Sequence, residues 1–207
     1  MKKRHIIFDM DGTLSNTAKA TLTAIDQVRD RFILPPIDDS GVRDAMGIAG
    51  LDFFRKMFPT VAEDVIVKLG PEVDALELAS IQSLGATVLF PGVIEMLETL
   101  RQAGIKMYIA STGSHVHVDG TLQATGIKHY FEGIYSGEPA KIDMVRRILG
   151  DACPSEWAMV GDMYKDSEAA RGSNMMALGA GFGYLAEEDH PLFDAVLTTP
   201  ADLQKYV

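Results

Sequence analysis

The hydrophobic positions of the chain follow two different patterns, short continuous runs and helical spacing. Ile6, Ile7 and Phe8 form a short apolar run near the N-terminus, as a buried strand would show. Between residues 17 and 84 the apolar side chains recur at helical spacing, and no strand-like run occurs there. From residue 86 onward, short apolar runs alternate with helical segments. The pattern therefore predicts a block of helices inserted between the first strand and the rest of a mixed fold.

The inserted block is predicted to contain several helices. Its first helix covers residues 17–33, and Thr17 is a candidate cap for it. Its last stretch, residues 61–84, predicts one or two helices with an interruption at Gly70 and Pro71, because proline lacks a backbone donor and crowds the preceding turn. Together these helices indicate a lid over the remainder of the chain.

Five further apolar runs after residue 86 have the length of short buried strands, and helical segments separate them. They cover residues 105–110, 131–135, 157–160, 175–178 and 195–197, and a terminal helix is expected from about residue 200. Strands that alternate with helices predict an α/β fold with a doubly wound parallel sheet. We expect a core of residues 1–15 and 86–207 and a helical lid of residues 16–85.

Composition narrows the class of protein. The chain has 207 residues, 47% hydrophobic and 23% charged, which is ordinary for a globular protein, and its net charge of -10 argues against nucleic-acid binding. Its one cysteine, Cys153, excludes an internal disulfide framework and suits a reducing compartment. The basic N-terminus is followed at once by Asp9 and Asp11, so no signal peptide is expected, and residues 175–186 are too short to span a bilayer. We expect a cytoplasmic protein, a monomer or weak homodimer, with no nucleic-acid or membrane partner.

The first candidate for chemistry is the aspartate pair that follows the first strand. Asp9 and Asp11 are two positions apart, and in an extended chain such residues point to the same side. Gly12 then permits a sharp turn. Because ligands of open α/β sheets lie beyond the carboxyl ends of the strands, both carboxylates can aim at one point there. Their repulsion needs a compensating cation, and a hard dication such as Mg²⁺ prefers oxygen ligands.

A phosphate site and a positive charge are predicted from two later positions. Ser111 ends the strand over residues 105–110 and is followed by Thr112 and Gly113, so a hydroxyl and free backbone N–H groups lie near a helix N-terminus, as in a phosphate cradle. Lys141 opens a later helix, where the helix dipole disfavours a cation. This local conflict indicates another use for the lysine, for which Lys128 and Lys165 are competing candidates.

A second pair of acids follows the strand over residues 157–160. Gly161 makes the turn, Asp162 lies at the strand end and Asp166 comes four residues later, so both carboxylates can face the same side of a helical turn. With Asp9 they give a cluster of acids on neighbouring strand ends.

Four stretches of the chain resemble, in order, the four motifs of the haloacid dehalogenase-like hydrolase superfamily, the Asp-nucleophile phosphatases and phosphomutases. They are Asp9-Met10-Asp11-Gly12-Thr13-Leu14, the hydrophobic strand closed by Ser111, the lysine Lys141 at a helix start, and Gly161-Asp162-Met163-Tyr164-Lys165-Asp166. The resemblance covers nearly the whole chain. It implies a Rossmann-like core with a helical cap inserted after the first strand.

The resemblance also implies a role for each candidate residue. Asp9 would attack phosphorus and form an aspartyl-phosphate, and Asp11 would protonate the leaving oxygen and then deprotonate the attacking water. Mg²⁺ would have four ligand residues: Asp9, Asp11 through its backbone carbonyl, Asp162 and Asp166. The phosphoryl oxygens would be balanced by Ser111 and Lys141, with a backbone donor from Thr112 or Gly113.

In this family an aspartate at the position of Asp11 favours ester hydrolysis or phosphomutase chemistry. We therefore expect a Mg²⁺-dependent phosphatase that acts on a small phosphorylated metabolite, similar to phosphoglycolate phosphatases. Asn16 departs from the pattern, since many of these phosphatases have Asp in that region. The alternative is a β-phosphoglucomutase-like enzyme, whose cap usually offers a Gly-x-Ser-Arg-like loop. The nearest match here, residues 46–50, lacks both Ser and Arg.

Two alternatives of a different class stay open, a receiver-type phosphoacceptor and a catalytically silent binding protein with this fold. A receiver carries its phosphorylated aspartate at a central strand end and has no helical insertion of this size. The intact set of acids argues against a silent protein. Two histidines after the phosphate loop, His115 and His117, are expected on the surface of the next helix.

Overall fold

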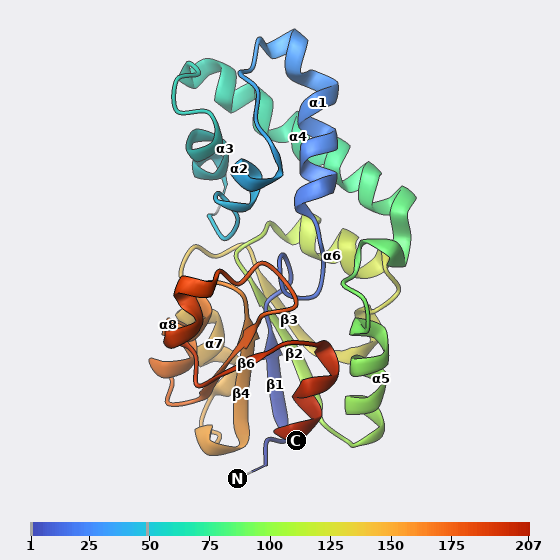
Figure 1. The fold of residues 1–207 in the computed structure, drawn as a ribbon, viewed down its shortest axis with the longest axis vertical. Coiled ribbons are helices and arrows are strands. Elements are labelled where there is room, and N and C mark those ends of the chain that lie inside the picture. Colours follow the sequence, from blue (N-terminus) through green and yellow to red (C-terminus); the bar gives the residue numbers. More distant parts are fainter. Residues whose placement is uncertain (1, 49) are drawn as a thin grey trace.

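Six parallel strands form one sheet in the computed structural model, which describes residues 2–48 and 50–207 (Figure 1). In chain order they are β1 His5–Phe8, β2 Lys106–Ser111, β3 Phe131–Ser136, β4 Trp157–Gly161, β5 Met176–Ala180 and β6 Ala195–Leu197. Their order across the sheet is β3-β2-β1-β4-β5-β6. The first strand therefore lies between two strands that come much later in the chain, β2 and β4.

Helices cover both faces of the sheet, and the alternation of side chains along β1 explains why there are two cores. Ile6 and Phe8 point to one face, where they share a cluster with side chains of α5 Val93–Gln102 and α6 His115–Ala124. Ile7 points to the other face, where α7 Lys141–Leu149 and α8 Tyr164–Arg171 complete a second cluster. The predicted α/β class with a doubly wound parallel sheet is confirmed.

Four further helices pack together above the carboxyl ends of the strands (Figure 1). They are α1 Ala18–Phe32, α2 Asp39–Arg43, α3 Leu51–Met57 and α4 Glu63–Leu84, and we call residues 18–84 the helical unit. The unit has a buried cluster of its own, in which side chains of α1 and α4 such as Ile25 and Leu69 take part. The unit thus has a hydrophobic core separate from the two cores of the sheet, with Tyr184 of the sheet part packed against it.

The two stretches that join the helical unit to the sheet run side by side. The backbone N–H of Asn16 donates to the carbonyl of Val88 over 2.7 Å, and that of Phe90 donates to Leu14 over 3.0 Å. The unit is thus attached to the sheet by a pair of neighbouring connections.

The predicted interruption at Gly70 and Pro71 is wrong, because α4 continues through both residues. The reason lies in its packing against α3. A Cβ on the buried Gly70 would lie 2.8 Å from the side chain of Leu51 and 3.3 Å from that of Phe54, so the missing side chain lets the two helices approach closely. This packing offsets the cost of a proline inside a helix, which is about 3 kcal/mol.

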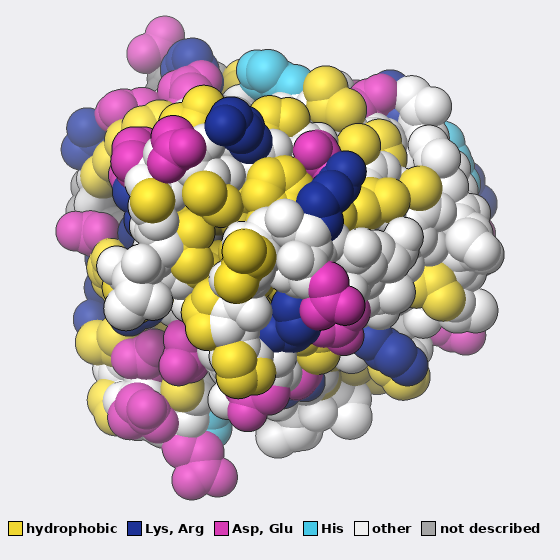
Figure 2. All heavy atoms as spheres, turned by 90° about the horizontal axis from the view of Figure 1, so that it is seen from above, with side chains coloured by type: hydrophobic (Ala, Val, Ile, Leu, Met, Phe, Trp, Pro, Cys, Tyr) yellow, Lys and Arg dark blue, Asp and Glu magenta, His cyan; other side chains and the backbone are white. Residues whose placement is uncertain are grey.

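The surface and the end of the chain add three observations. In the view from above, Lys and Arg side chains are scattered among acidic and hydrophobic ones (Figure 2). None of the helices in the described part of the chain combines the length and the apolar character that a membrane span needs. The helix expected near the C-terminus is a 3-10 helix, Pro200–Lys205, in which Asp202 accepts the backbone N–H groups of Thr198 and Thr199.

Candidate active site

The carboxyl ends of three strands bring the candidate residues together below the helical unit. Asp9 follows β1, Ser111 ends β2 and Asp162 follows β4. The register brings these ends level, because Phe8 of β1 pairs with Ile109 of β2 and with Val160 of β4. Residues far apart in the chain therefore lie at one end of the sheet.

Three buried acids form the centre of this region. One carboxylate oxygen from each of Asp9, Asp162 and Asp166 lies within 4.8 Å of the others. Burial is the main cause that raises the pKa of Asp9 to about 7 and the pKa of Asp162 well above its usual value. Thr13 donates its hydroxyl to Oδ1 of Asp162 over 2.7 Å, whereas the buried Oδ2 has no hydrogen-bond partner among the described residues. A buried carboxylate oxygen without a partner, beside two further acids, fits a divalent cation such as Mg²⁺.

Lys141 supplies a positive charge to this cluster. Its Nζ lies 2.6 Å from Oδ1 of Asp166 and 2.9 Å from Oδ2 of Asp9. Burial alone would lower the pKa of Lys141, but the carboxylates of Asp166 and Asp9 raise it above its ordinary value, so the amine is charged. The second oxygen of Asp166 accepts the backbone N–H of Met163 over 2.9 Å. These ion pairs explain why a lysine opens α7 against the helix dipole.

The loop after β2 places small polar groups on the same cavity as Asp9. Ser111, Thr112 and Gly113 all line it. The backbone N–H of Gly113 donates to Oγ of Ser111 over 3.1 Å, which leaves the hydroxyl proton of Ser111 available for a ligand. Thr112 instead donates its hydroxyl to the carbonyl of Gly47, in the helical unit, over 3.3 Å. The loop thus offers a hydroxyl donor and also contacts the helices above it.

Three side chains contact the carboxylate of Asp11, of which Ser15 is the most distant at 3.5 Å. Oδ1 of Asp11 accepts the hydroxyl of Thr17 over 2.8 Å, and Nε2 of His117 lies 3.0 Å from Oδ1 and 3.1 Å from Oδ2. Burial would raise the pKa of Asp11, but the contacts with His117 and Thr17 lower it below its ordinary value. Thr17 is the N-cap residue of α1, as predicted, yet its hydroxyl binds Asp11 and makes no capping bond to the helix.

The predicted surface position of His117 is wrong. Its ring lies between two carboxylates, because Nε2 contacts Asp11 and Nδ1 lies 3.3 Å from Oε2 of Glu77 on α4. Burial would lower the pKa of His117, but the charges of Asp11 and Glu77 raise it well above its ordinary value, so the imidazole is protonated at neutral pH. His115 is exposed, as predicted. Residues two apart on a helix point about 200° apart, so the two histidines cannot share one face.

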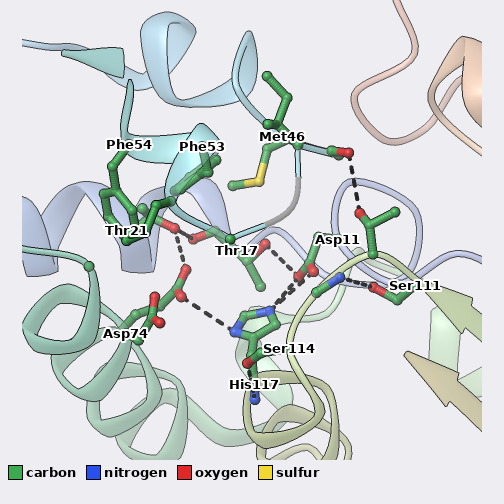
Figure 3. A pocket seen from close by; sticks show the side chains of 18 of the residues that line it. Asp11, Thr17, Thr21, Met46, Phe53, Phe54, Asp74, Ser111, Ser114 and His117 are labelled. Atoms are coloured by element: carbon green, nitrogen blue, oxygen red, sulfur yellow. Dashed lines mark hydrogen bonds and ion pairs between the residues drawn. The ribbon is translucent and has the colours of Figure 1, made fainter. Parts of the chain in front are cut away.

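A cavity of about 220 Å³ opens between the sheet and the helical unit. Figure 3 shows that Phe53, Phe54 and Asp74 lie on the side of this cavity away from Ser111. The sheet thus provides the acids and the loop of Ser111, and the helical unit provides the opposite wall, including Glu77. The candidate chemistry lies at one end of a pocket whose other end consists of helices α3 and α4.

Sequence reasoning missed the residues of α4 that face this cavity. Gly70, Asp74 and Glu77 are four and three positions apart, so they share one face of the helix. This spacing could have shown that the three residues share a face of the helix. It does not show that this face lines a cavity. Glu77 is buried and accepts the hydroxyl of Thr21 from α1.

Comparisons with known proteins identify the family of this chain. Residues 6–180 match the family model described as haloacid dehalogenase-like hydrolase. The chain belongs to this family. A phosphoglycolate phosphatase from Pectobacterium atrosepticum is 30% identical to it over 217 residues, which covers 97% of this chain and 90% of the relative. Another, from Caulobacter vibrioides, is 28% identical, with 97% and 89% covered. The prediction of an enzyme, a hydrolase of the phosphatase kind, is confirmed.

Solved structures of family members share the fold. A haloacid dehalogenase-like hydrolase from Streptococcus pneumoniae superposes with a TM-score of 0.85 at 24% identity, covering 99% of this chain and 98% of that one. A β-phosphoglucomutase from Clostridium difficile gives a TM-score of 0.78 at 20% identity, with 97% and 93% covered. The fold alone therefore does not separate a phosphatase from a phosphomutase. Membership in a family of hydrolases argues against the receiver-type phosphoacceptor.

Proposed function

We propose that this family member is a Mg²⁺-dependent phosphatase that hydrolyses a small phosphomonoester through an aspartyl-phosphate. The surroundings of Asp9 carry the proposal. Its carboxylate is buried, pairs with Lys141 and lines a cavity of about 220 Å³. A carboxylate kept close to a fixed cation at a cavity wall is suited to attack an anionic phosphoryl group.

The proposed metal ligands are those that the family resemblance implies. Asp9 and Asp162 would bind Mg²⁺ through their side chains, Asp11 through its backbone carbonyl, and Asp166 would complete the set. The unpartnered Oδ2 of Asp162 supports this assignment, since such an oxygen costs free energy until it gains a ligand. When bound, the ion would shield the anionic Asp9 from an anionic substrate. Asp166 also holds Lys141 in place, over 2.6 Å.

Asp9 and Asp11 would carry the two chemical steps. A carboxylate oxygen of Asp9 bonds to phosphorus while the ester bond breaks, and the proton that His117 shares with Asp11 passes through Asp11 to the leaving oxygen. Asp11 then takes a proton from a water molecule, whose oxygen attacks phosphorus. The bond between Asp9 and phosphorus breaks, phosphate leaves, and both aspartates return to their first states. Ser111 and Lys141 would donate to the phosphoryl oxygens, helped by a backbone N–H of Thr112 or Gly113.

The contact between Asp11 and His117 provides the proton that the acid role requires. Asp11 has a lowered pKa and is ionised, whereas His117 is protonated, and the two share one proton over 3.0 Å. This proton lies at the wall of the cavity, where the leaving oxygen of a substrate would be placed.

We further propose that residues 16–85 act as a cap domain on a core of residues 1–15 and 86–207. The separate hydrophobic cluster of the helical unit and its paired connections to the sheet support these boundaries. The cavity lies between the two parts, so the cap would exclude water from it and select the substrate. We also infer a cytoplasmic enzyme, a monomer or weak homodimer, without nucleic-acid or membrane partners, in keeping with the lone Cys153 and the net charge of -10.

A β-phosphoglucomutase-like enzyme is the second candidate. The similarity of fold to the β-phosphoglucomutase from Clostridium difficile favours it. In residues 46–50, however, no serine or arginine is present, and the carbonyl of Gly47 accepts bonds from Thr112 and from Lys165, the latter over 3.0 Å. Ala49 of this loop lies outside the described residues. An assay with β-glucose 1-phosphate separates the two candidates, since isomerisation without net release of phosphate would establish the mutase.

The experiment that tests the phosphatase is a panel of phosphomonoesters, including p-nitrophenyl phosphate, assayed for release of inorganic phosphate with Mg²⁺ and with a chelator. We expect release that depends on Mg²⁺ and is lost in Asp9→Asn. Full turnover by Asp9→Asn would show that Asp9 is not the nucleophile. Full turnover in the presence of the chelator would show that the reaction does not need Mg²⁺.

A further inference from the structure

The end of the cavity that lies away from Ser111 has an acidic wall without a basic side chain to match it. The described residues that line the cavity include no lysine and no arginine. They include Asp74 and Glu77 of α4, and the positively charged residue among them is His117. Any leaving group that enters this space therefore meets carboxylates of the helical unit.

The single positive charge of His117 is already shared. Its two ring nitrogens contact Asp11 and Glu77, and Glu77 also accepts the hydroxyl of Thr21. Asp74, in contrast, makes no hydrogen bond or ion pair with another described residue, although its side chain lines the cavity. The side chain of Asp74 is exposed to solvent. Desolvation by the surrounding protein, and then the charge of Glu77, raise the pKa of Asp74 to about 6 against the opposing charge of His117, so the carboxyl is mostly ionised at neutral pH. One unpaired negative charge thus faces the space for the leaving group.

Two aromatic rings line the same side of the cavity as this charge. Phe53 and Phe54 of α3 line the cavity, and both lie with Asp74 on the side away from Ser111 (Figure 3). The ring planes of the two phenylalanines are 79° apart, so they present a face and an edge in different directions. Aromatic faces attract organic cations, most strongly when water is excluded. A carboxylate and aromatic rings around one space form a site suited to an ammonium group.

We propose that the substrate is a phosphomonoester whose leaving group carries a positively charged amine, which Asp74 and the rings of Phe53 and Phe54 receive. This inference rests on the phosphatase function proposed above and names its substrate class. A leaving group with a carboxylate, such as glycolate, would instead place a negative charge beside Asp74 and Glu77, with His117 already paired. The cavity of about 220 Å³ limits the leaving group to a small one.

Two matched pairs of esters test the proposal. Phosphocholine and its uncharged isostere 3,3-dimethylbutyl phosphate have the same shape, as do phosphoethanolamine and propyl phosphate, so each pair differs mainly in one positive charge. We expect kcat/KM for the charged member of at least one pair to exceed that of its neutral partner by about tenfold, with phosphoglycolate below both. In Asp74→Asn this preference is expected to fall to near one.

Glu72→Gln is the matched control, because Glu72 lies on the same helix but pairs with Arg31 and does not line the cavity. It should keep the preference for the charged esters. Equal kcat/KM within both pairs, a preference for phosphoglycolate, or an unchanged preference in Asp74→Asn would each overturn the inference while phosphatase activity stands. Absence of phosphate release from every ester, p-nitrophenyl phosphate included, would overturn the proposed function and this inference with it. A circular dichroism melt of each variant shows whether the fold is kept.

Discussion

Nδ1 of His117 lies 3.3 Å from Oε2 of Glu77, and this contact joins the sheet side of the molecule to the helical unit. The other nitrogen of the same ring contacts Asp11. One imidazole therefore touches both the proposed acid–base residue and a helix that walls the cavity. A shift of α4 would change the position of the ring and, through it, the orientation of Asp11.

Replacing His117 by Asn tests this connection. General acid–base catalysis contributes about 10²–10⁴-fold, so we expect a loss in kcat of up to about 10²-fold if Asp11 remains present but poorly oriented. The two carboxylates of Asp11 and Glu77 also lose their shared cation, which should lower the free energy of unfolding by about 1–3 kcal/mol. Steady-state kinetics and urea unfolding measure the two effects. His129→Asn is the control, since His129 is exposed and does not line the cavity, and an unchanged kcat in His117→Asn would contradict the proposed role.

Asp162→Asn tests the metal site through the stability of the folded protein, without a measurement of enzyme activity. The pKa of Asp162 is raised in the folded chain, so its ionised form weakens the fold increasingly as the pH rises from the ordinary carboxyl value toward the raised one. Without metal, the variant should therefore be more stable than the parent at about pH 8 and equal to it at about pH 4. Oδ1 of Asn can still accept the hydroxyl of Thr13.

Added Mg²⁺ should reverse the order of the two proteins. A ligand at a hundred times its Kd stabilises a folded protein by about 2.7 kcal/mol, and Asp162→Asn should lose most of that gain. Thermal melts with Mg²⁺ and with chelator give the comparison. Asp26→Asn, which changes an exposed acid on α1, should respond to Mg²⁺ as the parent does. If Mg²⁺ raised the melting temperature of Asp162→Asn as much as that of the parent, the ion would not bind at Asp162.

The sheet and the ends of its strands could be predicted from the sequence because their signals are local. The short apolar run of Ile6 to Phe8 is typical of a buried strand, and Asp9 comes directly after it. Once the strands are parallel, their carboxyl ends share one edge, which also brings Ser111 and Asp162 to that edge. The parallel topology therefore brings short motifs that are far apart in the sequence into one site.

The wall of the cavity could not be predicted, because it depends on how one helix turns against another. His117 and His115 are two positions apart, and the helical pattern did not show which one faces Glu77. The break expected at Gly70 and Pro71 failed for a similar reason, since the close packing of Gly70 against α3 outweighs the local cost of Pro71. These are tertiary contacts, and the helix propensities of single residues carry no information about them.

The pH dependence of stability gives an independent check on Asp74. Its pKa is raised to about 6 in the folded chain, so the cost of its charge is absent near about pH 4, grows between there and about pH 6, and is fully present above. Asp74→Asn should therefore melt at a higher temperature than the parent at about pH 8 and at the same temperature at about pH 4. Glu72→Gln serves again as control, since Glu72 forms an exposed ion pair with Arg31. A difference in melting temperature that does not vary with pH would mean that Asp74 has an ordinary environment.

Gly12→Ala tests whether the turn after Asp11 supports the acid cluster. Gly12 has a φ of +83°, and a Cβ there would lie 2.3 Å from Oδ2 of Asp162 and 2.7 Å from the ring of Tyr184. Alanine must therefore displace Asp162 or the turn, in addition to adopting a backbone conformation that costs about 1–2 kcal/mol. We expect a large loss of phosphate release and a weaker response of the melting temperature to Mg²⁺.

Gly126→Ala separates the two effects of that substitution. Gly126 has a φ of +73°, but a Cβ on it would meet no atom within 4 Å. It should therefore lose the backbone contribution of about 1–2 kcal/mol and keep both activity and the response to Mg²⁺. If Gly12→Ala and Gly126→Ala reduce stability equally and both retain activity, then the side chain of Asp162 is free to move without consequence, and the acid cluster does not depend on the turn at Gly12.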